Sequence, residues 1–221
     1  MNMNPSKLAM VPFVSVANMM KLVHSIGLET FLKDVATEIE ADFARWEMFD
    51  KTPRLGSHSD VGVIELMPTS DGEFYGFKYV NGHPKNMAEG LQTVTAFGLL
   101  ADVYSGYPVM LSEMTVLTAL RTAAMSAVAT KHLAAPNATT MAMIGNGAQS
   151  EFQCLAQKAV NGITHIRLYD TDPAATAKCM ANLAGHGLDV TPCKSPQEAI
   201  EGADIITTAT ADKDMQTILT D

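Results

Sequence analysis

The stretch Met141-Ala-Met-Ile-Gly-Asn-Gly-Ala-Gln-Ser150 decides the fold class of this chain. Its first four residues form a short apolar run typical of a buried strand, and a helical pattern begins at Gln149. Between them the motif reads G-x-G-x-x-S, with Ser150 where a third glycine is usual. This order predicts a loop in which Gly145 makes a tight turn and Gly147 lets the backbone approach a diphosphate, although a glycine pair alone also fits an ordinary strand-to-helix turn.

An acidic residue follows the loop at the spacing that a dinucleotide-binding unit requires. Asp170 ends the next predicted strand, close to the ~20 residues expected between the glycines and the carboxylate that accepts from ribose hydroxyls. The alternative for Asp170 is a capping or solvated aspartate. The complete unit of strand, glycine pair, helix, strand and acid favours a dinucleotide, and a carboxylate that repels a 2′-phosphate predicts NAD rather than NADP.

Beyond Pro136, short apolar runs alternate with helical patterns. Strands are predicted at 141–144, 164–169, around Val190 and at 205–208, and helices at 149–160, 173–183 and 196–200. This alternation predicts right-handed βαβ units and a parallel sheet. A doubly wound fold needs about six strands. We therefore expect residues 138–221 to form a partial Rossmann-type domain of about four parallel strands, in a chain that is the N-terminal part of a longer protein.

Residues 1–137 have a different pattern of apolar residues, and this pattern predicts an α+β domain. From Ser15 to Phe49, apolar residues recur at three- and four-residue steps, which predicts amphipathic helix interrupted near Gly27. Two pairs of β-rich runs follow, at 61–67 with 74–80 and at 94–103 with 107–111, and then a long helix at about 115–133. The predicted fold class is α/β, with the Rossmann-type domain preceded by this α+β domain.

Composition excludes several other classes of function. Fifteen Lys and Arg against 24 Asp and Glu give a net charge of −9, which leaves no basic stripe for nucleic acid. The three cysteines and six histidines show no paired metal-ligand spacing, so we expect no metal site and reduced thiols. No apolar run reaches the ~18 residues of a membrane span, and the N-terminus does not read as a signal peptide. We expect a cytoplasmic protein that acts away from membranes.

Several stretches together resemble a known family in order and spacing. They are Ser57–Pro68, Phe77–Pro84, Thr118–Ala124, Ile144–Phe152 and Asp204–Thr208. From about Val16 to its end the chain is similar to the ornithine cyclodeaminase/mu-crystallin family. The resemblance implies a homodimer and a substrate-binding and dimerisation domain over residues 1–137. It also implies conversion of L-ornithine to L-proline and ammonia, with bound NAD taking a hydride and returning it within one turnover.

The resemblance also implies a substrate site. Arg54, Lys78 and Arg121 would hold the substrate carboxylate, which two guanidinium groups and an ammonium can do by charge-assisted hydrogen bonds. Glu65 would receive an amino group and Met67 would line the pocket. Read from the residues alone, Lys78 and Glu65 could be solvent-facing members of alternating strands. Arg121 stands in an otherwise apolar helix, where a lone charge is costly unless it has a partner.

Cofactor contacts implied by the family fall on nine positions. They are Thr93, Arg121, Thr122, Gly145, Gly147, Ala148, Gln149, Asp170 and Thr210. The family's catalytic aspartate falls beyond residue 221, so we expect this chain alone to be inactive. Other members of the family, namely an alanine dehydrogenase, a lysine cyclodeaminase or a ketimine reductase, stay open as alternatives. So does a crystallin-like protein that binds a dinucleotide or small ligand without catalysis.

Overall fold

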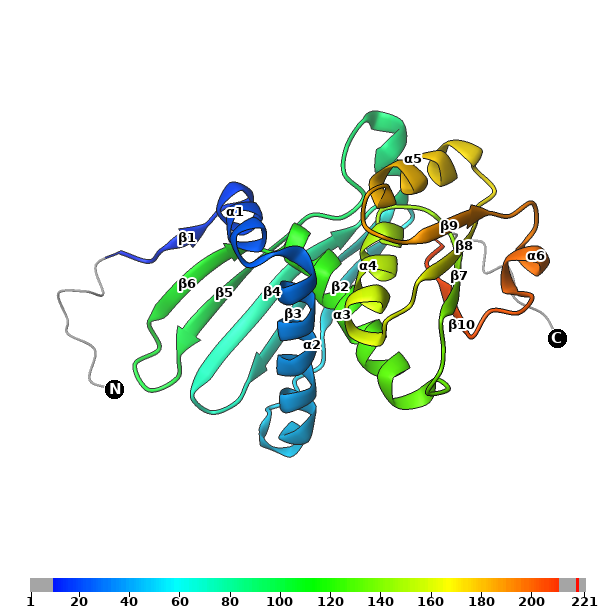
Figure 1. The fold of residues 1–221 in the computed structure, drawn as a ribbon. Helices are drawn as coiled ribbons and strands as arrows, with labels where there is room; N and C mark the ends of the chain where they lie inside the picture. Colours follow the sequence, from blue (N-terminus) through cyan, green and yellow to red (C-terminus); the bar gives the residue numbers. More distant parts are fainter. Residues whose placement is uncertain (1–9, 211–217, 219–221) are drawn as a thin grey trace. The chain divides into compact units, whose positions relative to one another are not determined.

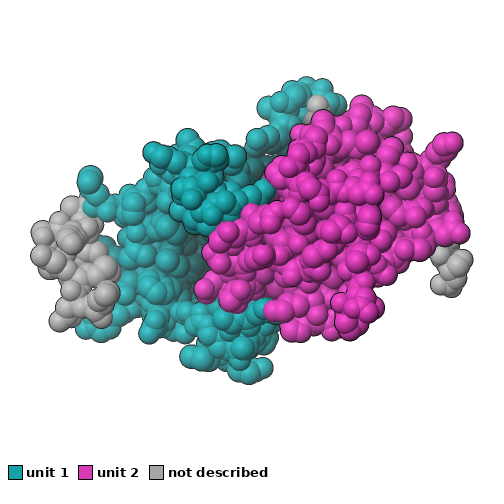
Figure 2. Space-filling model, viewed as in Figure 1, with its two compact units in different colours: residues 1–28, 40–118 teal, residues 29–39, 119–221 magenta. Residues whose placement is uncertain are grey.

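The computed structural model describes residues 10–210 and residue 218 of the chain (Figure 1). It divides into two compact units, which are distinguished by colour in Figure 2. Unit 1 comprises Met1–Leu28 and Glu40–Thr118, and unit 2 comprises Glu29–Ile39 and Ala119–Asp221. Two helices therefore supply residues to both units. The sequence predicts a boundary between two functional domains at residues 137 and 138, and this boundary stays a prediction.

Unit 1 is built around a six-stranded mixed sheet in the order β1-β6-β5-β4-β3-β2. Its strands are β1 (Phe13–Val14), β2 (Leu55–Ser59), β3 (Gly62–Ser70), β4 (Phe74–Gly82), β5 (Ala96–Asp102) and β6 (Pro108–Glu113). All neighbours pair antiparallel except β1 and β6, which are parallel. The four β-rich runs that the sequence predicts are thus confirmed as strands β3 to β6, whereas β1 and β2 gave no recognisable pattern.

Two helices follow β1, and Gly27 separates them. They are α1 (Val16–Ile26) and α2 (Leu28–Ala44). The side chain of Ser15 caps α1 by accepting from the Asn18 backbone N–H. Gly27 has φ +90°, a backbone conformation that favours glycine, so the interruption predicted there is confirmed. Short 3₁₀ helices lie at η2 (Trp46–Met48) and η3 (Pro84–Glu89).

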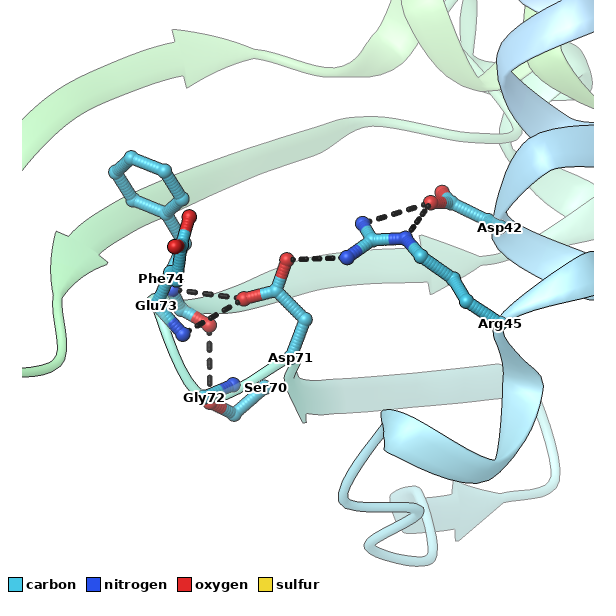
Figure 3. A network of polar contacts seen from close by, with 7 residues as sticks. All are labelled: Asp42, Arg45, Ser70, Asp71, Gly72, Glu73 and Phe74. Atoms are coloured by element: carbon cyan, nitrogen blue, oxygen red, sulfur yellow. Dashed lines mark hydrogen bonds and ion pairs between the residues drawn. The ribbon is translucent and has the colours of Figure 1, made fainter.

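A polar network ties the end of α2 to the turn between β3 and β4 (Figure 3). Arg45 reaches Asp42 at 2.9 Å and Asp71 at 3.0 Å. The other oxygen of Asp71 accepts from the backbone N–H groups of Phe74 and Glu73, at 2.8 and 3.0 Å. The Phe74 N–H first, with the Glu73 N–H and the Arg45 guanidinium, keeps the pKa of Asp71 below its usual value. The carboxylate therefore shapes the turn while it is ionised.

Unit 2 contains a four-stranded parallel sheet in the order β10-β7-β8-β9. Its strands are β7 (Thr140–Ile144), β8 (His165–Tyr169), β9 (Asp189–Pro192) and β10 (Ile205–Thr208), and its helices are α4 (Ser150–Asn161), α5 (Pro173–Leu183) and α6 (Pro196–Ile200). The predicted Rossmann-type arrangement of four parallel strands is confirmed. Because the chain passes from β9 to β10 on the far side of β7, the strand order reverses beside β7, where open α/β sheets bind ligands.

The core of unit 2 also takes in parts of two long helices. Helix α3 (Thr115–Leu133) contributes Ala124 and Val128, which pack with Ala36 of α2. Lys158 of α4 forms an ion pair with Glu29 of α2, and this contact lowers the pKa of the Glu29 carboxyl. These contacts group residues 29–39 with the parallel sheet. Among the helices of the described residues, none is long and apolar enough to cross a membrane.

Candidate dinucleotide site and substrate-binding residues

The loop after β7 needs a glycine at its first position. Gly145 has φ +91°, and its N–H donates to the Tyr169 carbonyl at the end of β8. A Cβ added to Gly145 would lie 2.8 Å from the Ala209 carbonyl oxygen and 3.0 Å from Thr210 Cγ2. The segment after β10 therefore runs against the turn, so the structure places Thr210 beside the glycine loop. Gly145 is required by the fold itself.

Gly147 differs, because nothing in the fold requires it to be glycine. Its φ lies outside the left-handed region, and a Cβ added there meets no described atom within 4 Å. The adjacent Ala148 is exposed, and α4 begins two residues later. The first N–H groups of a helix have no intrahelical acceptor and favour anions. The open side of Gly147 therefore fits the close approach of a diphosphate.

Asp170 sits directly beside this loop. Its Oδ2 accepts from the Asn146 backbone N–H at 2.5 Å, and its Oδ1 accepts from the Asp172 N–H at 2.8 Å. The carboxylate thus has the capping role considered as an alternative, but these bonds also fix its orientation. The Thr171 hydroxyl also lies 3.5 Å from Oδ1. An ionised carboxylate offers about four acceptor positions, so acceptor capacity is left for a ribose hydroxyl. The residues present fit a dinucleotide at this edge of the sheet.

Three buried amide oxygens near the loop strengthen this fit. Asn146 Oδ1, Gln149 Oε1 and Gln153 Oε1 have no hydrogen-bond partner among the described residues. Buried polar atoms usually have a partner in the protein, in ordered water or in a ligand. Sequence reasoning assigned Gln149 through the family, but it gave Asn146 and Gln153 no role. The place of Asn146 between the two glycines was the available signal for it.

Unit 1 brings together four of the predicted substrate residues. Arg54 Nη1 lies 3.1 Å from Glu65 Oε1, so the two residues form an ion pair. Glu65 and Met67 lie on the same face of β3, and Met67 pairs directly with Lys78 of β4. Lys78 is half-buried and its Nζ lies 3.5 Å from Thr118 Oγ1. Lys78 is therefore not the fully solvated strand lysine that the alternation alone would allow.

Thr93, Arg121 and Thr122 are the other residues that the family resemblance assigns to the substrate or the cofactor. Thr93, in unit 1, is half-buried and its carbonyl accepts from the His83 N–H at 2.8 Å. Arg121 and Thr122 lie on the part of α3 that belongs to unit 2. Arg121 is exposed, so the argument from the cost of burying a lone charge does not apply to it. Within residues 10–210, no group of three or more His, Cys, Asp or Glu side chains could hold a metal ion.

A parallel sheet with a glycine turn after its central strand and a carboxylate at the end of the next defines a dinucleotide-binding protein of the Rossmann class. The model of the ornithine cyclodeaminase/mu-crystallin family matches residues 16–221, and the chain belongs to this family.

Individual relatives agree with this assignment. The chain is 69% identical over 219 residues to an ornithine cyclodeaminase of Brucella suis, covering 99% of this chain and 61% of that relative. A solved lysine cyclodeaminase is 28% identical with a TM-score of 0.87, over 96% of this chain and 64% of that one. A Δ1-pyrroline-2-carboxylate reductase from Thermococcus litoralis, solved with NADH and L-proline, is 31% identical with a TM-score of 0.82, over 91% of this chain and 62% of that one. The chain thus spans about three fifths of the Brucella relative's length.

Proposed function

We propose that the protein is an NAD-dependent enzyme that converts L-ornithine to L-proline and ammonia. The observation that carries this proposal is the 69% identity to the Brucella suis ornithine cyclodeaminase over 99% of the chain. The geometry of the glycine loop is consistent with it, because the open side of Gly147 and the oriented carboxylate of Asp170 provide for the diphosphate and the ribose of NAD. When bound, NAD would supply the acceptor for the hydride that leaves the α-carbon of ornithine and the donor that returns this hydride to the cyclic imine.

The residues of unit 1 suit an amino-acid substrate. Arg54 and Glu65 form an ion pair in which the arginine side chain is 64% exposed and the glutamate 20%. A zwitterionic substrate offers a carboxylate to Arg54 and an ammonium to Glu65, so both charges can exchange one partner for another of the same sign. Lys78, together with Arg121 as the family resemblance implies, would add cations for the substrate carboxylate. These groups would bind and orient ornithine.

A homodimer in the cytoplasm completes the proposal, with a second copy covering one face of the unit 1 sheet. The directly paired residues Leu55, Leu66, Tyr79 and Phe97 form an apolar row on the face opposite to Lys78. Leu55 is 65% exposed and Phe97 45% exposed in the single chain. Neighbouring aromatic rings stack there, with Tyr79 and Phe97 centroids 5.1 Å apart. Apolar patches of this kind mark protein interfaces, and a two-fold pairing would bury the same patch on both copies.

The test is an activity assay with two proteins. One is the 221-residue chain, and the other is a fusion that continues it with the part of the Brucella suis enzyme beyond the matched region. We expect the fusion to release proline and ammonia in equal amounts from L-ornithine with catalytic NAD+. The chain alone tests the expectation that residues 1–221 are inactive by themselves.

The same assay separates the alternatives. L-lysine, pyruvate with ammonia and NADH, and a cyclic imine with NADH are offered as substrates to the fusion. Higher kcat/KM with any of these than with L-ornithine would assign the protein to another member of the family. Binding of NAD+ without turnover of any substrate would favour a non-catalytic binding protein.

A further inference from the structure

Asn146, between the two loop glycines, is a fully buried polar residue of the candidate dinucleotide site. Its exposed fraction is 0%, although it belongs to a loop at the edge of the sheet. Its side-chain Nδ2 donates to Thr176 Oγ1 on α5 at 2.9 Å. Its backbone N–H donates to Asp170 Oδ2 at 2.5 Å. One residue therefore links the glycine loop to both the acidic strand end and helix α5.

Helix α5 holds the loop through further contacts. Lys178 Nζ lies 3.3 Å from the Gly147 carbonyl oxygen and 3.5 Å from Glu151 Oε1. Asn182 Nδ2 donates to the same oxygen of Glu151 at 2.9 Å. Lys178 and Asn182 are exposed residues, and they contact Gly147 of the loop and Glu151 at the start of α4, whereas the Thr176 hydroxyl meets a fully buried amide. The Thr176 contact is therefore the one that fixes the position of Asn146.

We infer that Thr176 is a positioning residue that sets both the affinity for NAD and the preference for NAD over NADP, acting through Asn146 on Asp170. The inference rests on the proposed cofactor. The Thr176 hydroxyl holds the Asn146 amide, which aims the Asn146 backbone N–H at Asp170 Oδ2. Together with the Asp172 N–H on Oδ1, this bond fixes the plane of the carboxylate. A fixed carboxylate presents its remaining acceptor positions to the ribose hydroxyls and its charge to any 2′-phosphate.

The position of Thr176 explains why a remote hydroxyl can affect selectivity. Without this bond the buried Asn146 amide would lose its partner, and a buried unsatisfied amide favours a rearranged loop. Loss of the hydrogen bond from the Asn146 backbone N–H would then let the Asp170 carboxylate turn away from the ribose. Affinity for NAD+ falls in that state, whereas NADP+ gains because the repulsion of its 2′-phosphate weakens.

The test compares three variants with the unmodified chain by calorimetric titration of NAD+ and NADP+. Thr176→Val keeps the shape and removes the hydroxyl, and Thr176→Ser keeps the hydroxyl. Thr164→Val is the matched control, because Thr164 is exposed and lies before the start of β8, at the opposite end from Asp170. We expect Thr176→Val to raise the Kd for NAD+ about two- to tenfold, the range for losing one hydrogen bond. The ratio of the NADP+ and NAD+ dissociation constants falls with it.

We expect Thr176→Ser and Thr164→Val to keep the unmodified ratio. An unchanged ratio in Thr176→Val, with or without a lower Tm, would overturn the inference and leave Thr176 a structural residue. Failure of the unmodified chain to bind NAD+ would instead overturn the cofactor proposal and this inference with it. The two failures are thus distinguished by the unmodified chain.

Discussion

The two loop glycines should respond to substitution in opposite ways. Gly145 has φ +91°, and an added Cβ would lie 2.8 Å from the Ala209 carbonyl oxygen. Gly147 has an ordinary φ, and an added Cβ meets nothing within 4 Å. We therefore predict that Gly145→Ala damages the fold and that Gly147→Val damages cofactor binding alone.

The magnitudes follow from this geometry. A non-glycine residue in the left-handed region costs about 1 to 3 kcal/mol, and the overlap with the Ala209 backbone adds to that cost in Gly145→Ala. A substitution into open surface space stays within about 0.5 kcal/mol, which is the change expected in the free energy of unfolding of Gly147→Val. The valine side chain would fill the space through which the diphosphate approaches, so the Kd for NAD+ should rise at least tenfold, about 1.4 kcal/mol.

Urea denaturation and calorimetric titration of NAD+ measure the two effects separately. Gly147→Val should unfold at the same urea concentration as the unmodified chain and bind NAD+ at least tenfold more weakly. Unchanged NAD+ affinity in Gly147→Val would refute the placement of the diphosphate at this loop. Unchanged stability in Gly145→Ala would refute the argument from the contact with Ala209.

Three further predictions concern single side chains. Asp170→Ala should bring the dissociation constants for NAD+ and NADP+ together in a titration, and equal constants in the unmodified chain would contradict the role of Asp170. Arg121→Leu in the fusion should weaken L-ornithine binding by about 1.5 to 3 kcal/mol, the range for a hydrogen bond to a charged group. The change in NAD+ binding should be smaller. Unchanged KM and kcat for L-ornithine would leave Arg121 without a substrate role. Asp71→Asn should lower the free energy of unfolding by about 0.5 to 1 kcal/mol, as for a screened ion pair. Because the pKa of Asp71 is lowered in the folded chain, this difference should be full above about pH 5 and disappear as the pH falls through the folded pKa; a difference that persists at lower pH would contradict the assignment.

Much of unit 2 could be predicted because its signals are local. Strand β7 is a short, buried apolar run, and helices α5 and α6 each begin with a capping residue followed by proline, as Asp172 and Pro173 do for α5. The glycine loop and Asp170 are also indicated locally, by residue type and by their spacing along the chain. Unit 1 was predicted less completely. Strand β2, Leu55–Ser59, is exposed throughout, so it carries no alternation of buried and exposed residues.

The contacts within the site depend on pairings that a single sequence does not show. Arg54 meets Glu65 because the unrecognised strand β2 folds back on β3. Asn146 meets Thr176 across 30 residues, through the packing of α5 against the loop. Neither residue type nor spacing indicates such contacts. The grouping of residues 29–39 with the parallel sheet has the same origin, since it depends on how α2 packs with α3 and α4.

We propose that bound NAD takes a hydride from ornithine and returns it to the product. The most direct test follows deuterium from the α-carbon of L-[2-²H]ornithine, using the fusion with catalytic NAD+ and mass spectrometry of the product. We predict that proline retains deuterium at its α-carbon while NAD+ is not consumed. Proline that has lost the deuterium, or that forms only as NAD+ is consumed in equal amount, would contradict the claim.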